Sequence, residues 1–206
     1  MIKKSIELSG RTLTLETGRL AKQAGGSVLV TYGETVVLVA STASQGIDEY
    51  RGFFPLTVDY REKFYASGKI PGGFFRREAR PSEQEIIGAR LTDRPLRPLF
   101  PDGFYNETHI FINVLSFDGE NNGNILGTLG ASASLAISDI PWDGPVASIT
   151  VGRISGELII NPTNTQIEES DLEIIISGTK ESVVMVEGEA KIFLTDEFSL
   201  TFNHYN

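Results

Sequence analysis

Two runs of β-branched residues, separated by a tight-turn tripeptide, constrain the fold of this chain more than any other feature. Residues 27–31 and 35–40 are rich in valine and threonine, and Tyr32-Gly33-Glu34 lies between them. β-Branched side chains favour strands, and a glycine-containing turn between two such runs predicts an antiparallel hairpin. The chain is therefore expected to contain a β-sheet.

Further strands are expected on both sides of this hairpin. Residues 5–8 and 12–15 flank Ser9-Gly10-Arg11 and predict a second hairpin. Pro55 cannot donate a backbone hydrogen bond, so the strand expected over 53–60 belongs at a sheet edge or begins near this proline. The other expected strands cover residues 109–117, 146–151, 157–160, 172–176 and 182–186.

Two helices are expected between these strands. Ser82 suits an N-cap and Glu85 completes a capping box, which predicts a helix that Pro95 and Pro98 end or kink. Residues 123–137 are rich in glycine, alanine and serine, as suits a helix whose backbone packs closely against a sheet. A glycine-containing loop over residues 66–80 precedes the first helix.

The order of strands, helix, strand, helix and strands predicts an α+β fold, with mixed β-sheet layers packed against helices. It does not fit a regular βαβ alternation. The length of 206 residues indicates one large domain. We place this domain over residues 1–191, followed by a divergent tail over 192–206.

Composition excludes several kinds of site. The chain has no cysteine, which excludes disulfides, thiolate metal sites and cysteine nucleophiles. His109 and His204 are too few for a multi-histidine metal site or a Ser/His/Asp triad of the usual kind. Neither a membrane span nor a signal peptide is expected, because no apolar run is long enough. We therefore expect a cytoplasmic protein that does not meet a membrane.

Positive charge is concentrated in one fifth of the chain. The formal net charge is −9, yet residues 61–101 hold nine basic and five acidic side chains, a local charge of +4. Residues 102–206 hold three basic and sixteen acidic side chains, a local charge of −13. This asymmetry fits a face for an anionic partner. An arginine-rich helix tied into structural ion pairs would give the same pattern, and charge alone leaves both interpretations open.

The most informative stretch lies in the long loop and reads Gly72-Gly73-Phe74-Phe75-Arg76-Arg77-Glu78. Flat rings can stack on the bases of single-stranded nucleic acid, and guanidinium groups can pair with phosphate oxygens. The alternative is that both phenylalanines fill the core while both arginines are solvated. Stacking is the favoured interpretation.

Three weaker candidates lie elsewhere. Arg90, Arg94 and Arg97 would share one helix face, either as a cationic stripe or as a packing face paired with Asp93. Residues 123–130 could hold a phosphate at a helix N-terminus, but they lack a P-loop lysine and the GxGxxG spacing, so packing is favoured. Four carboxylates near the end of the chain could ligate magnesium: those of Glu168, Glu169, Asp171 and Glu173. Acidic runs of this kind are usually solvated.

Several separated motifs together resemble one known family. GGFFRREARPSEQEIIGARLTDRPLRPLFP is similar to the signature of the first RNase PH-like domain of the polynucleotide phosphorylase family. GRLAKQAGGSVLVTYGETVVLVA before it and SLAISDIP after it match in kind and in order. The similarity covers about residues 5–191.

The resemblance implies a polyribonucleotide nucleotidyltransferase, which degrades mRNA 3′→5′ by phosphorolysis and releases nucleoside diphosphates. Family members form a ring-shaped trimer, and each chain carries two RNase PH-like domains, a helical linker, and KH and OB-type RNA-binding domains. This chain is similar only to the first RNase PH-like domain. Implied partners are single-stranded RNA, further copies in a homotrimer and other RNA-degradation proteins. The implied cofactor is Mg²⁺, expected in the second RNase PH-like domain and not in this chain.

In the family, the FFRR loop lines the central opening of the trimer and grips RNA. The resemblance therefore implies RNA binding by Phe74, Phe75, Arg76, Arg77 and Arg80. Arg90, Arg94 and Arg97 match the family's arginine-bearing helix, which lies towards the RNA path and subunit contacts.

The catalytic residues of the family's second domain have few counterparts here. Glu83 and Gln84 stand where that domain has two adjacent arginines, and Asn124-Ile125-Leu126 stands where it has phosphate-binding serines. Of its acidic pair, one position falls near Ile167 and the other on Glu173. Phosphorolysis needs cationic and hydroxyl donors for phosphate and carboxylates for the metal. We therefore assign no catalytic residue and no metal ligand to this chain.

After Lys191 the family continues with a glutamate-rich helical segment, whereas this chain reads IFLTDEFSLTFNHYN. A truncated or frame-shifted gene product would show such a departure. Two alternatives to an RNA-guiding half therefore stay open. One is a self-sufficient phosphorolytic ribonuclease that uses Asp171, Glu173 and the arginine face, and the other is a non-functional assembling fragment.

Overall fold

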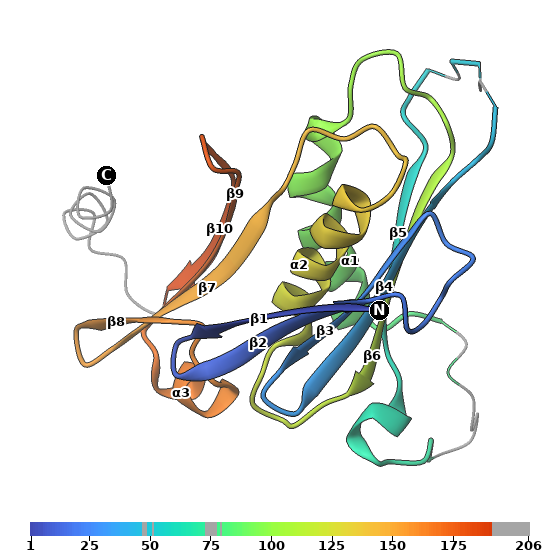
Figure 1. The fold of residues 1–206 in the computed structure, drawn as a ribbon. Helices are drawn as coiled ribbons and strands as arrows, with labels where there is room; N and C mark the ends of the chain where they lie inside the picture. The colour runs from blue at the N-terminus through green and yellow to red at the C-terminus, as the bar shows by residue number, and fades with distance from the viewer. Residues whose placement is uncertain (47–48, 51, 73–77, 79, 191–206) are drawn as a thin grey trace.

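The computed structural model describes residues 1–190, apart from 47–48, 51, 73–77 and 79 (Figure 1). Within these residues the strands form a six-stranded sheet in the order β1-β2-β3-β4-β6-β5 and a four-stranded sheet in the order β10-β9-β7-β8. The strands of the first sheet are β1 (Ile2–Leu8), β2 (Arg11–Thr17), β3 (Gly26–Tyr32), β4 (Thr35–Ala43), β5 (Leu56–Glu62) and β6 (Thr108–Ser116). Those of the second are β7 (Ala147–Ile154), β8 (Glu157–Ile160), β9 (Leu172–Gly178) and β10 (Val183–Ala190).

The first sheet contains both predicted hairpins. β1 pairs with β2 and β3 with β4, each antiparallel. The first turn uses Ser9 (φ 49°) and Gly10 (φ 73°), a left-handed pair of the kind that two-residue hairpin turns require. β5 begins at Leu56, three residues later than expected, because Pro55 precedes it. It occupies the sheet edge and pairs in parallel with β6.

The second sheet contains the strands expected over 146–151, 157–160, 172–176 and 182–186. β7 pairs with β8 and β9 with β10, and β7 and β9 join the two hairpins. A short helix that was not predicted, α3 (Asn164–Glu169), lies between β8 and β9. Its signal was in the sequence, because Thr163 and Gln166 form a capping box.

Helix α1 (Glu83–Leu96) begins as predicted. The Ser82 hydroxyl accepts from the Glu85 N–H at 3.2 Å, and the Glu85 carboxylate accepts from the Ser82 N–H at 2.6 Å. The helix passes through Pro95 and ends one residue later, where the 3₁₀ turn η2 (Arg97–Leu99) follows. A second 3₁₀ turn, η1 (Phe64–Ser67), follows β5 at the start of the long loop.

Helix α2 (Gly123–Ala136) lies between the two sheets (Figure 1). It packs on β3 and β4 of the first sheet and on β7 of the second. The core around it contains the fully buried side chains of Val30, Val37, Val39, Ile110, Ile112 and Leu135. These layers confirm the α+β fold. No described helix is both long enough and apolar enough to cross a membrane.

Arg11 ties the two sheets together. Its guanidinium lies 4.5 Å from the centre of the Tyr32 ring and donates to the Asn121 side chain at 2.5 Å. It also donates to the backbone oxygen of Asn161, just after β8. One side chain therefore connects the first hairpin, the loop before α2 and the second sheet.

Candidate functional site

The predicted RNA-binding loop is only partly covered by the structure. Phe74, Phe75, Arg76 and Arg77 lie outside the described residues. Arg80 is described and exposed, two residues before the N-cap of α1. The RNA-binding role of these five residues stays a prediction.

The two ends of this loop are tied to each other by Glu78. Its carboxylate accepts from the Phe64 N–H at 2.6 Å and lies 3.8 Å from the Lys63 ammonium. The same ammonium donates to the Glu78 backbone oxygen at 3.4 Å. Glu78, which directly follows Arg77 in the chain, is therefore attached to the start of η1.

The arginines of α1 have different surroundings. Arg97 binds the Asp93 carboxylate at 2.8 and 3.1 Å and donates to the backbone oxygens of Phe54 at 3.0 Å and Leu56 at 3.1 Å. Arg97 therefore attaches the end of α1 to the start of β5, as the packing interpretation expected. Arg94 pairs with Glu187 of β10.

Arg90 is exposed and lines a groove of about 350 Å³ between α1 and β5. Among the described residues, two of the three arginines are thus paired with carboxylates. A contact of this helix with RNA or with a neighbouring subunit stays a prediction.

Carboxylates gather where β5 ends and both long helices begin. The Glu85 side chain is buried and accepts from the Glu62 N–H at 2.9 Å. Tyr60 donates its hydroxyl to the Glu62 carboxylate. Burial, followed by the charge of Glu62, raises the pKa of Tyr60 well above its ordinary value, so the phenol stays protonated.

The start of α2 belongs to the same junction. A Cβ on Gly123 would lie 2.5 Å from the Tyr60 hydroxyl oxygen, and one on Gly88 of α1 would collide with the Asn124 side chain. The Asn122 side chain accepts from the Asn124 N–H at 2.8 Å and caps the helix. The carboxylates of this junction oppose a phosphate, and the Tyr60 hydroxyl already donates its hydrogen to Glu62.

The acidic residues near β9 do not converge into a metal site. The Asp171 carboxylate accepts from the Arg153 guanidinium at 2.9 and 3.1 Å. Glu173 lies opposite Glu189 in the sheet, and burial together with the charge of Glu189 raises the pKa of Glu173. In the parts of the chain that are described, no three His, Asp or Glu side chains group as metal ligands would. The described acidic residues near β9 therefore do not fit a Mg²⁺ ion.

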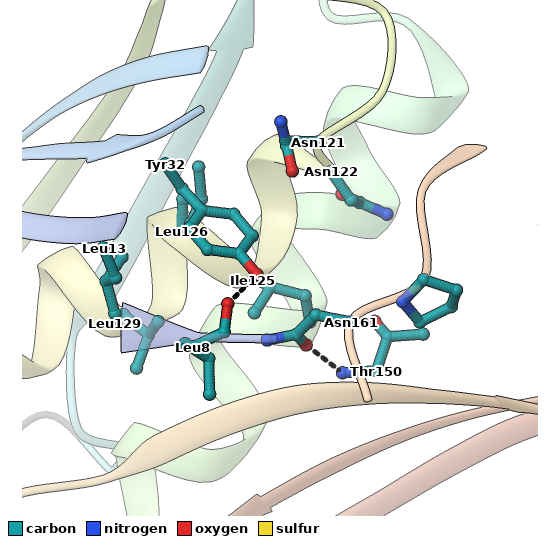
Figure 2. A pocket seen from close by; sticks show the side chains of 11 residues that line it. Leu8, Leu13, Tyr32, Asn121, Asn122, Ile125, Leu126, Leu129, Thr150 and Asn161 are labelled. Atoms are coloured by element: carbon teal, nitrogen blue, oxygen red, sulfur yellow. Dashed lines mark hydrogen bonds between the residues drawn. The ribbon is translucent and has the colours of Figure 1, made fainter. Parts of the chain in front are cut away.

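Figure 2 shows a small cavity between the first hairpin, the start of α2 and β7. Its volume of about 20 Å³ suits a water molecule and is too small for a nucleotide. Across it, the Tyr32 hydroxyl donates to the Leu8 oxygen at 2.9 Å and the Thr150 N–H donates to the Asn161 side chain at 2.9 Å. The cavity belongs to the joint between the sheets and not to a substrate site.

Comparison with known proteins is consistent with the sequence motifs. Residues 9–141 match the family model described as 3′ exoribonuclease family, domain 1, and residues 144–199 match domain 2 of the same family. The chain is 55% identical over 195 residues to a polyribonucleotide nucleotidyltransferase of Thermomicrobium roseum, covering 95% of this chain and 25% of the relative. It is 56% identical over 190 residues to one of Heliobacterium modesticaldum, covering 90% of this chain and 26% of the relative.

The chain spans about a quarter of the length of these relatives. A solved structure, rice (Oryza sativa) Rrp46, superposes with a TM-score of 0.70 at 14% identity, over 93% of this chain and 86% of that one. At this identity the superposition speaks for the fold alone, and it agrees with the α+β architecture described above.

Proposed function

Because this chain belongs to the 3′ exoribonuclease family, we propose that it is the RNA-guiding half of a polyribonucleotide nucleotidyltransferase. Such an enzyme shortens RNA from its 3′ end by phosphorolysis and releases nucleoside diphosphates. In this proposal the chain grips single-stranded RNA with Phe74, Phe75, Arg76, Arg77 and Arg80, and it contributes to a homotrimeric ring.

The observation that carries the proposal is the FFRR sequence on a loop whose carboxyl end is attached at Glu78. Two rings and two guanidinium groups supply stacking and phosphate contacts, which together suit single-stranded RNA. Glu78, the residue that follows this sequence, is itself held at η1 by the Phe64 N–H and the Lys63 ammonium.

We further propose that this chain does not perform phosphorolysis alone. α1 begins with Glu83 and Gln84 where the family's second domain has two adjacent arginines, so the cations that phosphate needs are missing there. The acidic residues near β9 do not fit Mg²⁺, as described above. We propose that the magnesium-dependent step takes place in a second RNase PH-like domain.

The experiment compares binding of labelled oligoadenylate by the wild-type chain and by the Arg76→Ala/Arg77→Ala variant, over a range of salt concentrations. Each phosphate contact to single-stranded RNA contributes about 0.7 to the slope of log affinity against log salt, so losing two should reduce the slope by about 1.4. Affinity at low salt should fall by about tenfold or more.

The matched control is Lys3→Ala/Lys4→Ala, which removes two exposed positive charges from β1 at the far edge of the first sheet. Its slope should stay close to that of the wild type. Equal affinity of wild type and Arg76→Ala/Arg77→Ala at low salt would contradict the proposal.

A further inference from the structure

We propose that η1 presents a second base-stacking surface for single-stranded RNA, formed by Phe64, Tyr65 and Lys69. We call it the η1 platform. This inference rests on the proposed function, because it requires RNA to reach the neighbouring Phe74–Arg77 loop. It adds residues that the FFRR motif does not contain.

The η1 turn is held firmly by its backbone. Its Ala66 side chain is buried in the core, and the Ala66 oxygen accepts from the Phe117 N–H at 2.9 Å, just beyond β6. Gly68 closes the turn with φ 66° and donates to the Tyr65 oxygen at 2.9 Å, while the Lys69 N–H donates to the Phe64 oxygen at 3.0 Å. Side chains on such a turn need little further ordering when a ligand binds.

Both aromatic rings of η1 face outward. Phe64 is 47% exposed and Tyr65 is 55% exposed, next to a core to which Ala66 contributes. Large exposed rings on a hydrogen-bonded turn offer contact area to a ligand, and binding orders few additional torsion angles. They therefore suit a flat ligand that stacks.

A hollow of about 210 Å³ lies beside Phe64. Val114, Ala66 and Phe117 provide apolar lining, while the charged side chains that line it are those of Glu62, Lys63 and Lys69. The volume is below the roughly 300–1,000 Å³ of pockets for drug-sized ligands, which suits one base better than a whole nucleoside triphosphate.

The charges at the hollow leave a cation for phosphate. Glu78 accepts from Lys63 and from the Phe64 N–H, and Glu62 accepts from the Tyr60 hydroxyl. Lys69 forms no ion pair with any residue in the described part of the chain. Exposed rings next to an available ammonium are the combination that binds single strands with little sequence preference.

The η1 platform contacts Glu78, the residue that follows the FFRR sequence in the chain. An RNA strand that follows the loop to Glu78 therefore meets Phe64, whose N–H donates to the Glu78 carboxylate at 2.6 Å.

The test measures oligoadenylate affinity of the intact chain by fluorescence anisotropy. Phe64→Ala/Tyr65→Ala should weaken binding about 5- to 150-fold, the range expected when stacking on one base is lost. Lys69→Ala should lower the salt slope by about 0.7. The matched control is Tyr50→Ala/Phe53→Ala, which removes two rings that are 63% and 62% exposed, and it should bind as the wild type does.

A conservative variant keeps the test decisive if the double alanine variant folds poorly. Tyr65→Trp retains a stacking ring, so it should keep its affinity, and oligoadenylate should quench the new indole emission.

The outcomes separate this inference from the proposed function. If Arg76→Ala/Arg77→Ala loses binding while Phe64→Ala/Tyr65→Ala keeps wild-type affinity, the η1 platform is overturned and the proposed function stands. No binding by the wild type would overturn both. A changed sedimentation mass with unchanged affinity would identify the surface as a protein contact and also overturn this inference.

Discussion

At the residue scale, Asp118 shows how one carboxylate fixes the loop that leads into α2. It accepts from the N–H groups of Glu120 and Asn121 at 2.8 Å each, from the Asn121 side chain at 2.5 Å and from the Glu34 N–H at 3.1 Å. Burial alone would raise the pKa of Asp118, but the hydrogen bonds from Asn121, Glu120 and Thr35 outweigh it and lower the pKa from 3.8 to about 2. The charged form is therefore part of the folded structure.

We expect Asp118→Asn to reduce the free energy of unfolding at neutral pH by about 1 kcal/mol, because the fall in pKa is worth roughly 2 kcal/mol and solvent exposure discounts it. The folded pKa is depressed, so this stabilisation is complete above pH about 4 and is lost as pH falls towards 2. Urea unfolding should show the wild-type advantage shrinking over this window. Asp102→Asn, at an exposed loop position, is the control, and a pH-independent gap for Asp118→Asn would contradict the expectation.

At the element scale, the glycines of α2 let the helix lie close to the sheet. A Cβ on Gly130 would lie 2.5 Å from Val39 Cγ2 and 2.9 Å from Val30 Cγ2. Both valines are fully buried in neighbouring strands and have stiff branched side chains. The small-residue composition of this helix therefore reflects close packing, as the sequence predicted.

Gly130→Ala tests this packing because two effects oppose each other. Alanine favours a helix interior over glycine by about 1 kcal/mol. Overpacking a filled core costs about 1–3 kcal/mol, and we expect it to win, giving a lower melting temperature. Gly72→Ala, whose added Cβ meets nothing within 4 Å, should leave the melting temperature nearly unchanged. A Gly130→Ala variant that is more stable than the wild type would show that the helix can move away from the sheet.

At the scale of the whole molecule, positive and negative charge are divided between parts of the chain. The basic segment 61–101 contains η1, the FFRR loop and α1, whereas the acidic remainder contains the second sheet. Arg94–Glu187 connects the two across α1 and β10. This division along the chain is what the proposed RNA-guiding role would require.

The corresponding prediction concerns activity of the intact chain. Incubation with labelled oligoadenylate, Mg²⁺ and inorganic phosphate should release no nucleoside diphosphate, while anisotropy in the same tubes shows bound RNA. The physical reason is that carboxylates occupy the junction where phosphate would need cations. Phosphate-dependent shortening, abolished in Glu173→Gln, would instead establish a self-sufficient phosphorolytic site near β9.

Local signals in the sequence were sufficient to predict most of the helices and strands. The capping box of Ser82 and Glu85, the hairpin turns at Gly10 and Gly33 and the small residues of α2 each depend on neighbours in the chain, so pattern alone located them. The order of the motifs was likewise sufficient to identify the family, because the FFRR signature and its flanking segments occur in the family's order.

Only the tertiary structure determined which partner each charged side chain contacts. Arg90, Arg94 and Arg97 have one spacing in the sequence, yet Arg97 holds β5, Arg94 meets β10 and Arg90 lines a groove. The link from Glu78 to Phe64 and the joint made by Arg11 likewise connect residues that no local pattern relates. Sequence periodicity fixes which side of an element a residue occupies, whereas the packing of distant elements determines its partner.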